Sequence, residues 1–282
     1  MHRKLLLAIL LAAVQLGPAS APAQEGFYVV GGRPMVGTGI SSLPYTISTP
    51  GYYYLTRNLS YNDGHGITVN ADNVTIDLMG FTLTGSYAGS SYRAVYIPDQ
   101  DNVEIRNGTL TGWSHGVYSA AGNNHRVIGV RAVGNETGIS LNHTNHLIQG
   151  CTAYPGGFGS GWGLSIGGGA ISGCTVGDFD TGIGIGYGVV SGNEVSDCSI
   201  GINTPGNAAI RHNQVNNCGT GIRAYGGASI TGNTVSSGTG QTGIVPATDA
   251  SRPDVLDQNC VSGAGTHYGP GSAATVWGAN GG

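Results

Sequence analysis

The chain has almost no lysine and little charge of either sign. Lys4 is its single lysine, and charged residues make up only 9% of the 282 residues. Nucleic acids and anionic membrane surfaces are bound mainly through clusters of basic side chains, so neither is an expected partner. Abundant serine, threonine and asparagine indicate a surface hydrated by hydroxyl and amide groups, which is compatible with a neutral polymer as ligand.

Long apolar runs are also lacking, except at the start of the chain. Residues 1–4 are basic, residues 5–16 are mostly aliphatic, and residues 21–23 are small. This pattern is typical of a secretory signal peptide and is too short to remain as a transmembrane anchor. We therefore expect cleavage before Gln24, export from a bacterium as a secreted or periplasmic protein, and no membrane insertion.

Glycine is abundant, with 52 residues, and much of it belongs to an internal repeat. Nine times a small residue precedes an aliphatic one, at intervals of 19 to 28 residues. Regular periods of about 20 residues or more indicate a solenoid. The pairs are Gly66-Ile67, Ala94-Val95, Gly116-Val117, Gly138-Ile139, Gly163-Leu164, Gly182-Ile183, Gly201-Ile202, Gly221-Ile222 and Gly243-Ile244.

Each repeat contains two further apolar positions, as in Val190–Val195, Ile210–Val215 and Ile230–Val235. Short β-branched runs separated by glycine, asparagine and serine indicate strands joined by tight turns. Identical motifs one period apart pair most simply in parallel, with a rise of about 4.8 Å per coil. The sequence therefore predicts an all-β fold, a right-handed parallel β-helix of about nine three-strand coils.

The repeat also suggests how the chain is divided. We expect a signal peptide at 1–23, an N-terminal strand cap at 24–62, the parallel β-helix at 63–263, and a C-terminal cap or tail at 264–282. Caps are expected because an open end of a solenoid would expose backbone and core. Val276 and Trp277 are the predicted apolar plug of the C-terminal cap.

Polar residues recur at the same position of successive coils. Asn193, Asn213 and Asn233 are each 20 residues apart, so their side-chain amides are expected to hydrogen-bond along the axis as a ladder. Asparagine also tolerates the left-handed backbone of tight turns. The expected role of these residues is structural.

The five cysteines follow the same stacking scheme. Cys151 and Cys174 occupy the position later filled by asparagine, Cys198 and Cys218 share another, and Cys260 is left over. Equivalent positions on adjacent coils lie about 4.8 Å apart, which is compatible with a disulfide, and export would permit oxidation. Stacked thiols also pack well without bonding. Both states remain open at this stage.

Two segments resemble a known group of proteins. Residues 66–85 and 102–110 are similar to the opening coils of secreted bacterial right-handed β-helix proteins of the pectate-lyase-like (pectin lyase-like) superfamily. The resemblance extends over essentially the whole mature chain and implies the β-helix fold. It specifies activity weakly, because that superfamily includes polysaccharide lyases, glycosidases, epimerases and adhesins.

The catalytic sets that this resemblance would imply are incomplete. Gly64-His65-Gly66 matches one element of polygalacturonase-like hydrolases, but the paired aspartates and the lysine of that set are missing. Four histidines gather in neighbouring coils without a known metal-binding spacing. They are His115, His125, His143 and His146.

Pectate lyases hold Ca²⁺ with clustered carboxylates, and the sequence contains one such cluster. Asp99, Asp101 and Glu104 cluster near Arg106. However, Asp101 lies in an Asp-Asn turn and Asp77 stacks opposite Arg106, so turn chemistry and an ion pair account for most of these residues. We therefore expect no metal site and no cofactor, with Ca²⁺ as the alternative.

The candidate binding surface is the outward side of the first strand of each coil. Aromatic rings interleaved with histidine and arginine suit a sugar ring and its polar groups. Two insertions, Tyr87–Tyr92 and Tyr154–Gly161, fall at the preceding turn and could wall a groove. The outward column comprises Thr68, Tyr96, Tyr118, Ser140, Ser165, Gly184, Asn203 and Arg223, and the turn residues before it include His65, Arg93, His115 and Trp162.

The resulting hypothesis is a secreted β-helix protein that interacts with polysaccharide or a cell-surface glycan. The predicted substrate-binding residues are His65, Tyr96, Tyr118 and Trp162, and the weak catalytic candidates are Arg93, His115 and Tyr118. One alternative is a lyase-type enzyme, with Arg93 or a histidine as base and Tyr96 or Tyr118 as proton donor. Another is a purely structural or adhesive surface protein whose outer aromatics only pack on one another. The sequence leaves the oligomeric state open.

Overall fold

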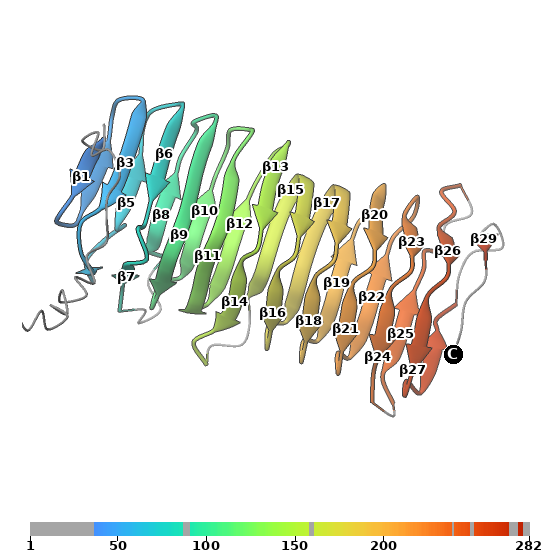
Figure 1. Ribbon diagram of the computed structural model, residues 1–282. Helices are drawn as coiled ribbons and strands as arrows, with labels where there is room; N and C mark the ends of the chain where they lie inside the picture. Colours follow the sequence, from blue (N-terminus) through green and yellow to red (C-terminus); the bar gives the residue numbers. More distant parts are fainter. Residues whose placement is uncertain are drawn as a thin grey trace, which may run out of the picture. The chain divides into compact units, whose positions relative to one another are not determined.

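The computed structural model describes residues 37–86, 91–157, 161–238, 240–248, 251–270 and 276–278. These residues form only strands and turns, and the strands pair in parallel into a right-handed β-helix of about ten coils. Figure 1 shows the coils stacked in chain order, from β1 at one end to β29 at the other. The predicted fold class is confirmed, whereas the predicted signal peptide lies outside the described residues.

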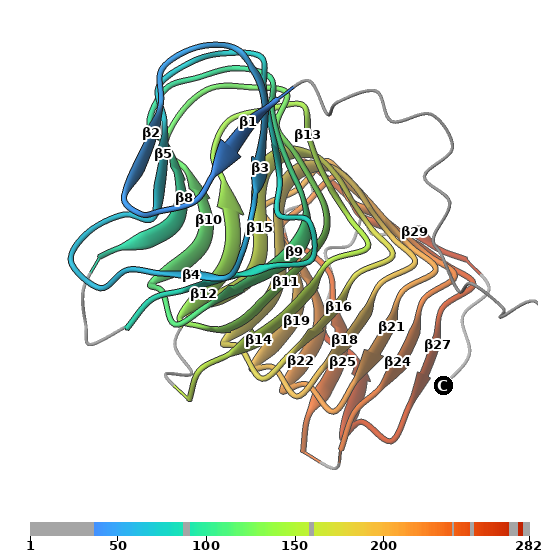
Figure 2. The same ribbon diagram turned by 60° about the vertical axis from the view of Figure 1, so that its left-hand side comes forward.

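The strands form three parallel ladders, which Figure 2 shows on different sides of the stack. Sheet 1 contains β2 (Tyr45–Ile47), β5 (Ile67–Val69), β8 (Arg93–Ile97), β10 (His115–Ser119), β12 (Thr137–Leu141), the first halves of β15 (Trp162–Ser172) and β17 (Thr181–Ser191), β19 (Ile200–Thr204), β22 (Thr220–Ala224), β25 (Thr242–Val245) and β28 (Thr266–Tyr268). Sheet 2 contains β1 (Thr38–Ile40), β3 (Gly51–Leu55), β6 (Val74–Asp77), the first halves of β9 (Val103–Thr111) and β11 (Arg126–Asn135), β13 (His146–Gln149), the second halves of β15 and β17, β20 (Ala208–Arg211), β23 (Ser229–Thr231), β26 (Val255–Asp257) and β29 (Val276–Trp277). Sheet 3 contains β4 (Leu59–Ser60), β7 (Thr82–Thr84), the second halves of β9 and β11, β14 (Thr152–Pro155), β16 (Thr175–Gly177), β18 (Glu194–Ser196), β21 (Gln214–Asn216), β24 (Thr234–Ser236) and β27 (Cys260–Ser262).

The ladders continue into both segments that the sequence suggested as caps. In the N-terminal segment, β2, β3 and β4 pair in parallel with β5, β6 and β7 of the next coil. In the C-terminal segment, β28 pairs with β25, and β29 pairs with β26. The side chains of Val276 and Trp277, the predicted plug, lie outside the described set.

The small residue of each repeat is required by close packing at a corner of the coil. A Cβ atom on Gly201 would lie 2.5 Å from the Cγ1 atom of Val215 and 2.5 Å from the backbone oxygen of Gly221. The following aliphatic residue, Ile202, is fully buried and stacks on Ile222 of the next coil. Burial of each such side chain stabilises the fold by roughly 1.5–3 kcal/mol. The repeat motif therefore encodes both a tight corner and one column of the core.

The predicted asparagine ladder is confirmed and extends one coil further than expected. The Nδ2 groups of Asn193, Asn213 and Asn233 donate to the Oδ1 atom of the next asparagine at 2.9, 3.0 and 3.0 Å, ending at Asn259. Each Oδ1 atom in this series also accepts a backbone N–H from the preceding coil. The ladder thus satisfies backbone groups that the turn would otherwise bury without partners.

All five cysteines are free thiols in the structure. Cys174 occupies the asparagine position, as predicted, because its backbone N–H donates to the Oδ1 atom of Asn193 at 2.9 Å. The thiols of Cys198 and Cys218 donate to the backbone oxygens of Ser196 and Asn216 at 3.2 and 3.4 Å. The four cysteines of the two stacked pairs are buried. They act as small core residues.

Candidate functional site

The predicted outward column of sheet 1 is confirmed by the register of the strands. Tyr96 pairs with Thr68 on one side and with Tyr118 on the other. The same column then continues in order through Ser140, Ser165, Gly184, Asn203 and Arg223. Because side chains alternate across a strand, these residues face outward while their neighbours fill the core.

Five side chains at the N-terminal end of this column form one connected group, here called the N-terminal patch. Its members are His65, Arg93, Tyr96, His115 and Tyr118. The rings of Tyr96 and Tyr118 are stacked, with centroids 6.1 Å apart and planes inclined by 19°. The guanidinium carbon of Arg93 lies 5.0 Å from the first centroid and 4.6 Å from the second. The two histidine rings flank this core, at 4.7 Å from Tyr96 and 4.9 Å from Tyr118.

The local structure explains why these side chains meet. Strands β8 and β10 place Arg93 opposite His115 at the start of each strand and Tyr96 opposite Tyr118 three residues later. The Nδ1 atom of His65 accepts the backbone N–H of Arg93 at 3.2 Å, which fixes that imidazole against the next coil. Four of the five residues therefore lie on two adjacent strands, and the fifth is tied to them by a hydrogen bond.

Burial and the neighbouring guanidinium keep both histidines of the N-terminal patch neutral. The pKa of His115 is lowered to about 4, mainly by burial and then by Arg93, while the Glu136 carboxylate acts in the opposite direction. The pKa of His65 is also lowered, by burial first and then by Arg93. The Oγ atom of Ser114 lies 2.8 Å from the Nδ1 atom of His115 and orients that ring. Arg93 is therefore the cationic group of the patch at neutral pH.

Within the described residues, Arg93 lacks the ion pairs that neutralise Arg106 on sheet 2. Arg106 forms ion pairs with Asp77 at 2.9 Å and with Glu104 at 3.1 Å. Arg93 has no such carboxylate partner among the residues that the structure describes, and its Nε atom is buried without a hydrogen-bond acceptor. An unpaired guanidinium against two aromatic rings is a feature that a bound polar ligand would complete.

Trp162 lies on the same face but outside the N-terminal patch. Its indole ring packs against Gly184, three steps along the column from Tyr118, or about 14 Å at about 4.8 Å per step. The side chain is 40% exposed. The sequence placed Trp162 just before Ser165 of the column and grouped it with the substrate-binding residues; the structure has it at the start of β15, apart from the N-terminal patch.

The proposed walls of the groove are only partly described. Tyr92 lies beside His65, with ring centroids 6.1 Å apart and planes at 90°. The remainder of the first insertion, residues 87–90, lies outside the described residues, as do residues 158–160 of the second insertion. The surface is therefore established as a connected group of side chains, not as an enclosed cleft.

Two of the carboxylates considered as calcium ligands, Asp101 and Glu104, have structural partners. The predicted pair of Asp77 and Arg106 is confirmed, and Glu104 bridges Arg106 to Arg126. Asp101 accepts the backbone N–H of Asn123 in a turn. No group of three or more histidine, cysteine or acidic side chains that could hold a metal ion occurs within the described ranges.

Two of the clustered histidines accept backbone N–H groups of the preceding coil, as the asparagines of the ladder do. The rings of His125 and His146 stack with centroids 5.0 Å apart and planes inclined by 8°. The Nδ1 atom of His125 accepts the backbone N–H of Val103 at 3.3 Å, and that of His146 accepts the N–H of His125 at 3.1 Å. The pKa of His125 is lowered to about 4, mainly by burial and then by the His146 ring. Their spacing of 21 residues was the available sequence signal for this role.

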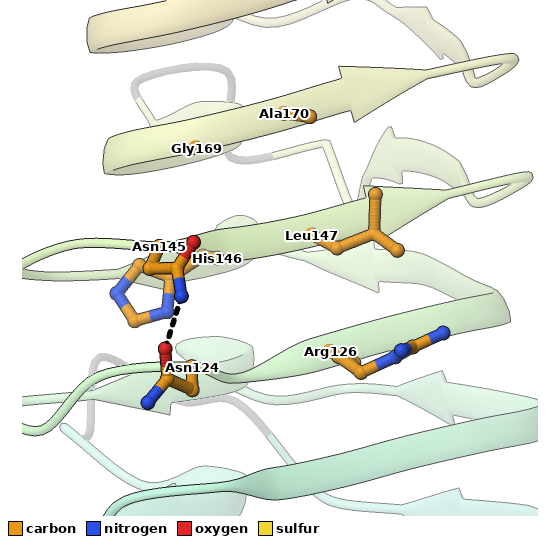
Figure 3. Close-up of a pocket in the computed structure, with 7 residues that line it drawn as sticks. All are labelled: Asn124, Arg126, Asn145, His146, Leu147, Gly169 and Ala170. Carbon is orange, nitrogen blue, oxygen red and sulfur yellow. Dashed lines mark hydrogen bonds between the residues drawn. The ribbon is translucent and has the colours of Figure 1, made fainter.

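A hollow of about 530 Å³ lies at the turn into sheet 2, and His146 is among the residues that line it (Figure 3). Arg126, Leu147, Gly169 and a hydrogen-bonded pair of asparagines are among the residues that line it. Its lining includes no tyrosine, tryptophan or phenylalanine ring on which a sugar could stack, and Arg126 is already paired with Glu104 at 3.3 Å. None of the predicted site residues lines this hollow, so we keep the N-terminal patch as the candidate site.

No helix in the described part of the chain is both long and apolar enough to cross a membrane.

Comparison with known proteins agrees with the fold. No curated protein sequence matches the chain. Among solved structures, the Dettilon tailspike protein (gp208) superposes with a TM-score of 0.67 at 15% identity, over 86% of this chain and 61% of the tailspike chain. This chain therefore spans about 61% of the tailspike's length. The A-module of the Azotobacter vinelandii mannuronan C-5 epimerase AlgE4 superposes with a TM-score of 0.48 at 14% identity, over 82% of this chain and 86% of that one.

These structural similarities are at low sequence identity and concern the fold alone. The family model described as "Right handed beta helix region" matches residues 93–260, which is more than half of the sequence. That range includes four of the five residues of the N-terminal patch and the strands from β8 to β26. The chain belongs to the right-handed β-helix family.

Proposed function

We propose that this protein binds a polysaccharide or cell-surface glycan through the N-terminal patch. The supporting observation is the guanidinium of Arg93, which lies over the stacked rings of Tyr96 and Tyr118 without a carboxylate partner in the described residues. Aromatic faces stack on the apolar faces of sugar rings, and a guanidinium donates hydrogen bonds to hydroxyl or carboxylate oxygens. The patch offers both contacts within one small area.

The flanking histidines add directed polar contacts to this proposal. Burial lowers the pKa of His65 and of His115, so neither ring adds a second positive charge at neutral pH. The Nδ1 atom of His65 already accepts the Arg93 N–H, which leaves its Nε2–H as a donor. The Nδ1 atom of His115 is engaged by Ser114, which leaves its Nε2 atom for a ligand. A sugar hydroxyl can contact either Nε2 atom. Arg93 would then select ligands that carry a carboxylate over otherwise similar neutral ones.

A second candidate function is a lyase-type reaction at the same patch. The observation that favours it is the contact between Ser114 and the Nδ1 atom of His115, because a donated Nδ1–H leaves the Nε2 lone pair free to act as a base. Tyr118, whose ring centroid lies 4.9 Å from that of His115, would be the proton donor. Binding alone requires fewer groups and is the function that the geometry supports better.

Export of the protein is part of the same proposal. The basic and apolar start of the chain would direct it out of the cytoplasm, where polysaccharides and cell-surface glycans are accessible. Mass spectrometry of protein recovered outside the cytoplasm tests this step, with a mature N-terminus at Gln24 as the expected result.

The proposed function is tested by retention of the purified protein on immobilised polygalacturonate, alginate and dextran, with and without calcium. We expect retention on at least one polymer and stronger retention on the two acidic polymers than on dextran. Ultraviolet absorbance of unsaturated uronates and an assay for new reducing ends are read on the same mixtures. Binding to none of the three polymers would contradict the binding proposal for these ligands. The appearance of unsaturated uronates would favour the lyase alternative.

A further inference from the structure

A second group of ligand-type side chains lies at the far end of the same face. Arg223 and Tyr225 line a hollow of about 190 Å³ together with Val245 and Pro246. Tyr225 is 54% exposed, the most exposed of the large hydrophobic side chains in the described residues. Arg223 and Tyr225 are here called the C-terminal patch.

The two patches lie on one continuous surface. Arg223 belongs to the same outward column as Tyr118, five steps further on, through strands that pair in unbroken order. At about 4.8 Å per step, this separation is about 24 Å along the stack. Both patches therefore face the same side of the β-helix and can contact one extended ligand.

The column between the patches has small side chains. Ser140, Ser165 and Gly184 occupy the three steps after Tyr118. The exposed indole of Trp162 lies against Gly184, with one face on the backbone. These short side chains leave the surface between the two patches unobstructed. The indole of Trp162 offers an aromatic surface there on which a sugar ring can stack.

The chemistry of the C-terminal patch repeats that of the N-terminal patch. Arg223 donates to the hydroxyl of Thr220 at 3.2 Å and forms no ion pair with any residue in the described ranges. Its neighbour in the column, Asn203, has an amide oxygen that is covered and lacks a hydrogen-bond donor. Arginine beside an exposed tyrosine again combines hydrogen-bond donors with a stacking surface.

We infer that the glycan contact extends from the N-terminal patch past Trp162 to the C-terminal patch, so that the preferred ligand is a chain long enough to reach both. This inference rests on the proposed function. It adds that the protein binds long glycan chains more tightly than short ones. A long chain bound at one patch is held at high effective concentration near the other patch. A short fragment would contact one patch only.

The test compares long and short fragments of alginate and of polygalacturonate by titration calorimetry. Wild-type protein should bind fragments that span about 24 Å roughly tenfold more tightly than fragments of two sugar units. The double variant Arg223→Ala/Tyr225→Ala should lose that advantage and still bind the short fragments through the N-terminal patch. Circular dichroism and thermal unfolding check that the variant is folded.

The matched control is Arg211→Ala/Tyr187→Ala, which removes the same two residue types from sheet 2. Arg211 lies on β20, and Tyr187, on the second half of β17, is 47% exposed. This control should retain the wild-type preference for long fragments. Equal length preference in wild-type protein and in the Arg223→Ala/Tyr225→Ala variant would overturn the inference while leaving glycan binding intact. Absence of binding to every fragment would overturn the proposed function as well.

Discussion

The indole ring of Trp162 lies directly against Gly184 of the next coil. A Cβ atom at position 184 would come 2.1 Å from the Cζ3 atom of that ring, so a side chain at position 184 and the present placement of Trp162 exclude each other. The same relationship occurs on sheet 3, where a Cβ atom on Gly177 would lie 2.5 Å from the ring of Tyr154. Glycine thus sets the position of an aromatic ring on two different faces.

The first prediction concerns this contact. Gly184→Ala should displace the indole of Trp162 and weaken the retention of long glycan fragments by about 1 kcal/mol, because an aromatic stacking contact is lost. Gly177→Ala should displace Tyr154 at a similar cost in thermal stability and leave glycan retention unchanged. Affinity and melting temperature are measured for both variants. Equal retention by the two variants would exclude Trp162 as part of the binding face.

The second prediction concerns the asparagine ladder. Asn213→Ala removes the Oδ1 atom that accepts from Asn193 and the Nδ2 group that donates to Asn233 and to the backbone oxygen of Val190. We expect the free energy of unfolding to fall by about 2–4 kcal/mol, since buried groups lose their partners. Asn216→Ala, on the outer side of β21, is the control and should cost less than about 1 kcal/mol. Urea unfolding measures both, and similar losses would mean that the ladder has no special role.

Much of the fold could be predicted because each repeat contains a residue pair whose two members are both set by packing. The tight corner at Gly201 demands a small residue, and the core demands an aliphatic residue at Ile202. Asn259 was missed because 26 residues separate it from Asn233, whereas the earlier members are 20 apart. A longer turn before that coil hides the period in the sequence, although the hydrogen-bond ladder is continuous.

The third prediction concerns pH. Burial lowers the pKa of His115 and His125 from 6.5 to about 4, so the folded protein keeps these rings neutral where the unfolded chain takes up protons. The unfolded state then binds more protons, and the free energy of unfolding should decrease as the pH falls from about 6.5 to about 4. Above that window these two groups contribute no pH dependence.

The variant His125→Asn tests the cause of this loss. Its amide oxygen can accept the Val103 N–H in place of the imidazole, and it does not titrate. Urea unfolding at about pH 7 and about pH 5 should show a smaller difference than in wild-type protein. His212→Asn, at an exposed turn, is the matched control. An unchanged difference in His125→Asn would assign the acid sensitivity to other groups.

The fourth prediction concerns the cysteines, for which the sequence allowed two outcomes. The thiols of Cys151 and Cys198 donate to backbone oxygens, which is the arrangement of packed, unbonded residues. Alkylation of protein denatured without reductant should therefore label all five cysteines, as read by intact mass. Labelling of only one would show that both stacked pairs are disulfides in the exported protein.

The candidate site was less completely predictable than the fold. The alternation of side chains along a strand gave the outward column, and the pairing of Tyr96 with Tyr118 followed from the repeat. The position of Arg93 over both rings could not be foreseen, because it depends on the rotamer of a long flexible side chain. The place of Trp162 depends equally on the absence of a side chain at Gly184.

The most direct test of glycan binding at the N-terminal patch compares the half-buried Tyr118 with the exposed Tyr187 on a different face. Tyr118→Ala removes a ring from beneath the guanidinium of Arg93, and Tyr187→Ala removes a ring from sheet 2. Titration with the best-retained polysaccharide should show a loss of about 1–3 kcal/mol for Tyr118→Ala and no loss for Tyr187→Ala. Equal affinities in wild-type protein and Tyr118→Ala, or equal losses in the two variants, would contradict the account.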